Sequence, residues 1–124
     1  MRVLKIKDLP ELPMDTATPI AGWTGGPVSR TRQAIIGEGQ SENFRCNVVN
    51  FRAGATTGWH VHDCDQILVV MAGKGMVATE GEEREIGVGD VVHIKAGERH
   101  WHGAKADSAM SHITVTTPGS RLVR

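Results

Sequence analysis

The sequence predicts an all-β fold in which short strands form a sandwich or barrel behind an irregular N-terminal arm. Short runs rich in Val, Ile and Thr recur from residue 31 onward, and glycine-containing turns separate them. No stretch asks for a long helix. The chain has 124 residues, enough for one domain with a modest core and too few for two of ordinary size. We therefore expect a single β domain over residues 28–124.

The irregular N-terminal arm is predicted over residues 1–27. Prolines at positions 10, 13, 19 and 27 remove backbone donors, and the threonines and glycines between them favour turns. The arm still carries apolar groups, in residues 3–6 and at Trp23. Two interpretations stay open: a loose terminus, or a segment that packs on the barrel or on a neighbouring subunit.

Within the domain, we expect strands at residues 31–36, 44–51, 66–71, 76–79, 84–86, 90–94 and 111–117. The predicted turns between the central strands are Gly73-Lys74-Gly75, Glu80-Gly81-Glu82 and Gly87-Val88-Gly89. If Gln66 points inward, strand alternation predicts that Leu68 and Val70 do so too. The opposite face, with Ile67 and Val69, is too apolar to remain in water.

A cluster of donor groups lies just before this central strand. His60 and His62 are one residue apart, so on a strand they project from the same face, and Gln66 has the same parity. Imidazole nitrogens are preferred ligands of zinc, copper, iron and nickel, and an amide oxygen suits manganese or iron. The alternative for Gln66 is a hydrogen bond to a metal-bound water. A second pair, His100 and His102, again shares a face, and one of these residues could complete the metal shell.

Both histidine stretches lie in spaced patterns, Gly54-x5-His60-x-His62-x3-Gln66-x6-Gly73 and Gly89-x5-Lys95-x-Gly97-x2-His100-x3-Ala104. These patterns resemble the first and second motifs of the cupin family, and together they cover about two-fifths of the chain. The chain departs from the family at three positions. Gln66 stands where glutamate is usual, Lys95 where proline is usual, and Ala104 where asparagine is usual.

More narrowly, residues 89–104 and 109–112 resemble small single-domain cupins that include bacterial manganese-dependent hydroxynitrile lyases, which also have a glutamine as a metal ligand. The resemblance implies a cupin jelly-roll barrel (double-stranded β-helix) and a divalent ion, with manganese favoured and iron, zinc or nickel as alternatives. It implies the metal ligands His60, His62, Gln66 and His100. It also implies that His102 and His112 lie near the substrate without binding the metal.

These last two histidines are the predicted acid/base groups. His102 is expected to face the same cavity as His100, where it could be an extra ligand, a hydrogen-bond partner of the ligands or an acid/base group. The acid/base role is favoured, because an imidazole titrates near neutrality and can accept or donate a proton. His112 shares a strand face with Thr114 and Thr116, and its alternative role is a structural hydrogen bond. In a lyase reaction, Lys95 or Arg99 is a candidate to stabilise a departing anion.

Other conspicuous residues are predicted to have no chemical role. His93 is interpreted as a hydrogen-bonded or half-exposed strand histidine. Cys64 has the parity of the ligands but sits near a bend, and we interpret it as an idle thiol. Trp59 and Trp101 have the opposite parity to the ligands and are expected on the outer side of the sheet.

Charge and composition narrow the partners. Fourteen basic residues balance fourteen acidic ones, so the sequence predicts neither nucleic-acid nor membrane binding, but a small-molecule substrate. Two cysteines and a charged first decapeptide predict a reducing cytoplasm, although a single disulfide stays open. The apolar outer face predicts a homodimer or homotetramer.

The predicted function is that of a metal-dependent lyase, similar to hydroxynitrile lyases, which splits a cyanohydrin into an aldehyde and cyanide. One alternative is a non-haem iron dioxygenase, because three histidines with open positions also suit iron and oxygen. Another is a non-catalytic cupin that binds a small ligand or a metal.

Overall fold

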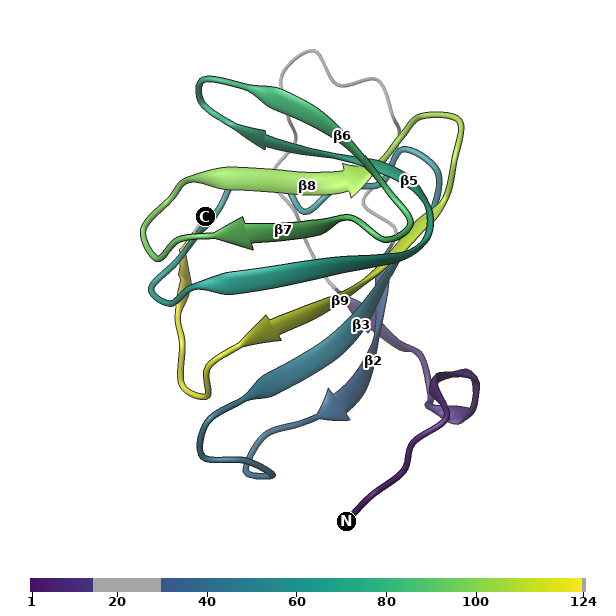
Figure 1. Cartoon of the computed structure of the whole chain (residues 1–124), viewed down its shortest axis with the longest axis vertical. Helices are drawn as coiled ribbons and strands as arrows, with labels where there is room; N and C mark the ends of the chain where they lie inside the picture. The colour runs from purple at the N-terminus through teal and green to yellow at the C-terminus, as the bar shows by residue number, and fades with distance from the viewer. Residues whose placement is uncertain (15–29, 124) are drawn as a thin grey trace.

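The computed structural model describes residues 1–14 and 30–123, and their regular structure is almost entirely β, as predicted (Figure 1). One short 3-10 helix, η1 (Ile6–Asp8), precedes the strands. The strands are β1 (Leu12–Met14), β2 (Arg30–Ile36), β3 (Arg45–Phe51), β4 (Val61–His62), β5 (Gln66–Thr79), β6 (Glu83–Gly87), β7 (Val91–Ile94), β8 (His100–Ala104), β9 (Met110–Thr116) and β10 (Leu122–Val123). In the described ranges, no helix is long and apolar enough to cross a membrane.

The long strand β5 joins the two sheets of a jelly-roll barrel. Its first half pairs with β7 and β9, and its second half pairs with β6 and β8, all antiparallel. Beyond β9, the first sheet continues through β3, β2 and β1. In Figure 1, β5 sweeps from the middle strands of the barrel to the β6–β8 end. The predicted cupin jelly roll, or double-stranded β-helix, is confirmed.

The predicted turn at Gly73-Lys74-Gly75 is wrong, because these residues lie inside β5. Gly73 has a φ of 74°, and a Cβ there would collide with the carbonyl of Ala109. A Cβ on Gly75 would collide with the side chain of Met110. The glycines therefore serve a bend and a close approach within one strand, which a local reading of glycine as a turn signal does not distinguish.

The other expected strands are confirmed with small shifts of their ends, as β2, β3, β6, β7 and β9. The strand β8 is not among the predicted strands, because Gly103 interrupts the run of strand-forming residues. A Cβ on Gly103 would meet the Ala55 carbonyl, so the glycine reflects another close approach. The strand β4 and the terminal strands β1 and β10 are also not predicted, because they are too short to show an alternating pattern.

The barrel interior has the predicted parity. Gln66, Leu68 and Val70 are buried, whereas Ile67, on the other face, is 42% exposed. The apolar core consists of Val49, Phe51, Ala55, Leu68, Val70, Val77, Ile86, Ile94, Ala104 and Met110. These residues fill one part of the interior, and the buried histidines occupy the rest.

The first part of the N-terminal arm packs on its own barrel. Gln33 of β2 donates its side-chain amide to the carbonyls of Ile6 and Leu9, at 2.8 and 3.0 Å. Val3 remains 86% exposed. The predicted anchor Trp23 and the predicted boundary at residues 27 and 28 lie outside the described residues, so the division of the chain at residue 28 stays a prediction.

Candidate metal centre and its histidine pair

His60, His62 and His100 meet inside the barrel, and their ligand atoms all lie within 4.8 Å of one another. His62 belongs to β4, His100 begins β8, and His60 lies between them in space. The backbones of His60 and His100 exchange two hydrogen bonds, from each amide to the other's carbonyl, at 2.9 and 3.0 Å. The amide of Gly97 also donates to the carbonyl of His62, at 2.8 Å. Backbone pairing therefore brings together histidines that are forty residues apart in sequence.

Two of these imidazoles have their proton fixed on the nitrogen that faces the backbone. Nδ1 of His60 lies 2.8 Å from the carbonyl oxygen of Gly58, and Nδ1 of His100 lies 2.8 Å from that of Glu98. A carbonyl oxygen only accepts, so each Nδ1 donates and each Nε2 keeps its lone pair. Burial also lowers the pKa of His100, which keeps its ring neutral. Both rings are set up as ligands through Nε2.

Gln66 completes this arrangement from the first residue of β5. Its side-chain NH2 donates to the hydroxyl of Thr114 at 2.8 Å, and its Oε1 faces Nε2 of His100 at 3.1 Å. Two lone-pair atoms that face each other repel unless a cation lies against both. Adjacent ligands of an octahedral ion, each at about 2.1 Å from it, are about 3 Å apart. The observed separation therefore fits a divalent ion.

His102 and His112 form a second, deeper group. They are 3% and 0% exposed, and Nδ1 of His102 lies 3.0 Å from Nε2 of His112. Burial lowers the pKa of His112 to about 4. Burial also lowers the pKa of His102, and the neighbouring imidazoles and the charge of Arg30 add to that effect. Both rings are therefore neutral at neutral pH, and one proton lies between the two facing nitrogens.

The histidine pair directly adjoins the three candidate metal ligands. The His102 ring stacks on the His100 ring, with centroids 5.6 Å apart and planes 11° apart, and its centroid is 5.5 Å from that of His60. Phe51 closes the pair on its other side, at 5.9 Å from His102 and 5.2 Å from His112. Nε2 of His102 is buried and has no hydrogen-bond partner among the residues that the structure describes. This atom is available to a bound molecule.

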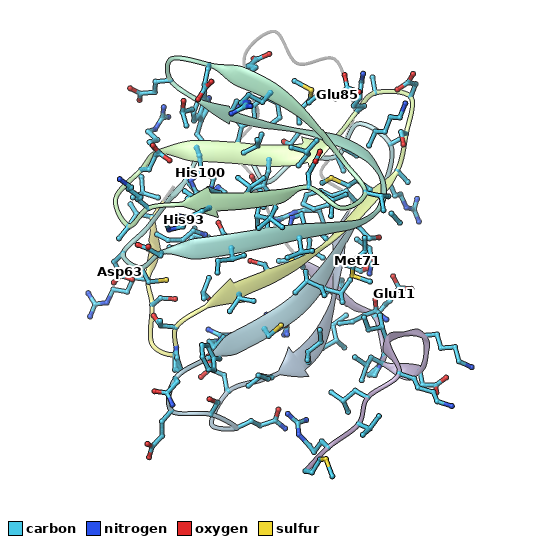
Figure 2. The ribbon with its side chains drawn as sticks, viewed as in Figure 1. Glu11, Asp63, Met71, Glu85, His93 and His100 are labelled. Carbon is cyan, nitrogen blue, oxygen red and sulfur yellow. The ribbon has the colours of Figure 1, made fainter. Side chains whose placement is uncertain are left out.

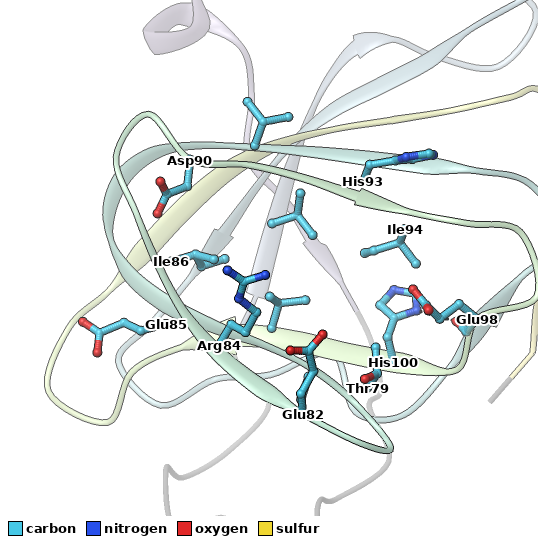
Figure 3. Close-up of a pocket in the computed structure, with 14 residues that line it drawn as sticks. Thr79, Glu82, Arg84, Glu85, Ile86, Asp90, His93, Ile94, Glu98 and His100 are labelled. Atoms are coloured by element: carbon cyan, nitrogen blue, oxygen red, sulfur yellow. Dashed lines mark hydrogen bonds between the residues drawn. The ribbon is translucent and has the colours of Figure 1, made fainter.

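A cavity of about 490 Å³ reaches His100 from the gap between β6 and β7. Figure 3 shows its apolar residues Ile86 and Ile94 together with Glu82 and the guanidinium of Arg84. Arg84 lies opposite Val77, which in turn lies opposite His102, so all three share the inward face of their sheet. Arg84 is not among the predicted site residues. Its parity with the buried Ile86, two residues further along, is the signal that could have indicated it.

The residues considered as anion stabilisers lie outside the site. Lys95 is exposed and follows the inward-facing Ile94. Arg99 stacks its guanidinium over the Trp59 ring, 4.5 Å from the ring centroid, and bonds Glu80 at 3.2 Å. Neither side chain enters the interior, so the expectation of a cation from Lys95 or Arg99 is wrong.

The residues predicted to lack chemistry are also placed. His93 is exposed on β7 (Figure 2). Its Nε2 lies 2.7 Å from a carboxylate oxygen of Asp65. Cys46 and Cys64 are both free thiols, so no disulfide joins them. Trp101, at 1% exposure, is buried on the face opposite the inward histidines of β8.

This fold and the buried histidine group are those of the cupins, and the family model described as the cupin domain matches residues 47–116. The chain therefore belongs to the cupin family. Its recognised relatives include a curated (R)-mandelonitrile lyase from Granulicella tundricola, 47% identical over 68 residues, which are 54% of this chain and 52% of that protein. The chain thus matches about half the length of this relative.

Solved structures agree on the fold. A cupin-like protein from Thermotoga maritima has a TM-score of 0.72 and 32% identity, over 78% of this chain and 77% of its own. The polyketide cyclase RemF from Streptomyces resistomycificus has a TM-score of 0.76 over all of this chain and 86% of its own. At 18% identity, the second likeness concerns the fold alone.

Proposed function

We propose that the protein is a metal-dependent lyase that cleaves a cyanohydrin into an aldehyde and cyanide. The observation that carries this proposal is the contact between two histidine groups, one arranged as ligands and the other arranged for proton transfer. The similarity to a mandelonitrile lyase supports the same reaction class.

The ion would be held by His60, His62, Gln66 and His100. The separation of 3.1 Å between Oε1 of Gln66 and Nε2 of His100 fits two ligands of one ion. Three neutral imidazoles and a neutral amide leave a divalent ion its full charge, whereas a glutamate would cancel one unit. Manganese is favoured because of the resemblance to manganese-dependent cupins, and a set of three imidazoles also suits iron, zinc or nickel. When bound, the ion supplies a Lewis acid that makes a nearby hydroxyl easier to deprotonate.

His102 would take the hydroxyl proton, and His112 would set its tautomer. When Nδ1 of His102 donates to Nε2 of His112, Nε2 of His102 presents a lone pair to the bound molecule. Loss of the hydroxyl proton to this nitrogen lets the carbon–carbon electron pair leave with cyanide. The carbon becomes an aldehyde carbonyl, and the proton returns to cyanide as hydrogen cyanide. Phe51 shields the pair from water.

The first experiment combines elemental analysis with mandelonitrile cleavage by the purified protein, with and without added manganese or iron. Near-stoichiometric metal and metal-dependent benzaldehyde release would support the lyase. Iron-dependent oxygen uptake without cleavage would favour a dioxygenase. Metal without turnover on any tested compound would favour a non-catalytic binding cupin.

We further propose that the chain works as a homo-oligomer in the cytoplasm, with the outer face of the first sheet as the subunit interface. Two rows of mainly apolar residues cross this face, through Cys46, Val115, Ile67 and His93 and through Val48, Ile113, Val69 and Val91. Ile67 and Val91 are 42% and 64% exposed. Sedimentation velocity of the wild type and of Val91→Asp would test the proposal, because a charge at this face should dissociate the assembly.

A further inference from the structure

The barrel interior contains a cation, Arg30, that is not among the predicted site residues. Arg30, the first residue of β2, is only 7% exposed. It lies opposite Phe51 of β3, which lies opposite Met110 of β9. Since Phe51 and Met110 belong to the buried core, strand pairing directs Arg30 to the same interior face.

Arg30 is close to the histidine pair. The next inward row on the same strands runs from Arg32 through Val49 to His112, so Arg30 and His112 flank the Phe51 side chain. The Phe51 ring contacts both imidazoles, at 5.2 and 5.9 Å between centroids. After burial, the positive charge of Arg30 adds a small further lowering to the pKa of both His102 and His112.

The chemistry of this end of the interior suits a small anion. A guanidinium is always charged and presents several donors, and its field is weakly screened inside a protein. Nε2 of His102, which is buried, has no partner among the described residues and can donate to the anion once it carries a proton. The apolar side chains of Phe51 and Met110 favour a monovalent, weakly hydrated ion over a strongly hydrated one.

We propose that Arg30 is an anion-binding residue of the interior site, and that the anion it receives in the reaction is the cyanide that leaves the substrate carbon. This inference rests on the proposed lyase function for the identity of the anion, but not for the site itself. The guanidinium accepts no proton and forms no bond. It stabilises the charge that arrives with the carbon–carbon electron pair until His102 returns the proton.

The test uses azide, a linear monovalent anion, with the zinc-loaded full chain and calorimetric titration. Arg30→Met keeps an unbranched apolar stem without the charge, and it should weaken azide binding about 10-fold or more, as expected for a lost charge-assisted hydrogen bond. The control Arg45→Gln removes a cation that pairs with Glu38 at 2.9 Å, and it should bind azide like the wild type. Elemental analysis must give equal zinc in all three proteins.

Wild-type azide affinity in a folded, zinc-loaded Arg30→Met protein would overturn the proposal. If that variant does not fold, nuclear magnetic resonance of the wild type decides. Azide should then shift the imidazole nitrogen signals of His112, which is outside the proposed ligand set. Shifts confined to His60, His62 and His100 would mean that azide binds only at the metal and would overturn the role of Arg30.

Azide binding at Arg30 without cyanohydrin cleavage would refute the proposed lyase and leave the anion site standing. Cleavage with azide binding that ignores Arg30 would do the reverse.

Discussion

Four of the interior histidines form two groups that differ in the hydrogen-bond partner of one ring nitrogen. In the first group, Nδ1 of His60 and of His100 donates to a backbone carbonyl at 2.8 Å. In the second, His102 and His112 share one proton with each other at 3.0 Å. All four rings are buried and the groups are in contact. Residue type and burial therefore do not distinguish them.

The difference lies in whether the partner can exchange a proton. A carbonyl oxygen holds the imidazole in one tautomer, which fixes a lone pair on the opposite nitrogen and suits a metal ligand. An imidazole partner can donate or accept, so the pair has two tautomeric arrangements and suits proton transfer. The same side chain gains two proposed roles from its hydrogen-bond partner.

Removing a residue of the first group should have the largest effect. His60→Ala deletes one ligand and should abolish metal occupancy, measured by elemental analysis after dialysis. The control His93→Ala removes an exposed histidine that pairs with Asp65, and it should retain the metal. Stoichiometric metal in His60→Ala would contradict the assignment of the site.

Removing a residue of the second group should separate metal binding from turnover. His102→Phe should keep the metal and lose roughly 100- to 10,000-fold in kcat, the range for an acid/base group. Steady-state cleavage of mandelonitrile, with elemental analysis of the same samples, measures both effects. Unchanged turnover in His102→Phe would exclude it as the base.

The second group should also make stability depend on pH. Burial lowers the pKa of His112 from 6.5 to about 4. Between these values, the unfolded chain binds protons that the folded chain excludes. The free energy of unfolding should therefore have its full value above about pH 6.5 and should fall by a few kcal/mol as the pH approaches 4.

Urea unfolding at several pH values measures this slope. His112→Phe, which replaces the titrating ring by an apolar one, should flatten it. An equally steep slope in the variant would place the acid sensitivity elsewhere in the molecule.

The smallest effects are expected from Gln66→Glu, which adds one negative charge beside the ion. Gln66→Glu should bind the metal as tightly or more tightly, by up to about 10-fold, because a carboxylate adds attraction. The same charge should reduce the acidity of a nearby hydroxyl and lower kcat. Calorimetric metal titration and cleavage assays measure the two changes. If neither quantity changes, Gln66 does not contact the ion.

Alternation along single strands explains how much of the site could be predicted. His60 and His62 share a face as predicted. The inward set of Gln66, Leu68 and Val70 along β5 follows from the same rule. Period-two alternation is a local property of an extended chain, so it can be read without knowledge of neighbouring strands. The approximate strand positions followed from comparable local patterns.

Features that depend on contacts between distant segments could not be read in this way. Glycines at 73 and 75 signal a turn locally, but the approach of β8 and β9 makes them part of one bent strand. Lys95 and Arg99 are near His100 in sequence and lie outside the interior. Arg30, remote in sequence, faces the interior because β2 pairs with β3.

By itself, the sequence determined the β class, the parity of each strand and the residue types available to a metal, because these depend on local sterics and side-chain chemistry. Only the tertiary structure decided which nitrogen of each histidine faces a carbonyl, which faces another imidazole, and which cation enters the interior. Those outcomes depend on the register between strands far apart in the chain, and no local pattern encodes that register.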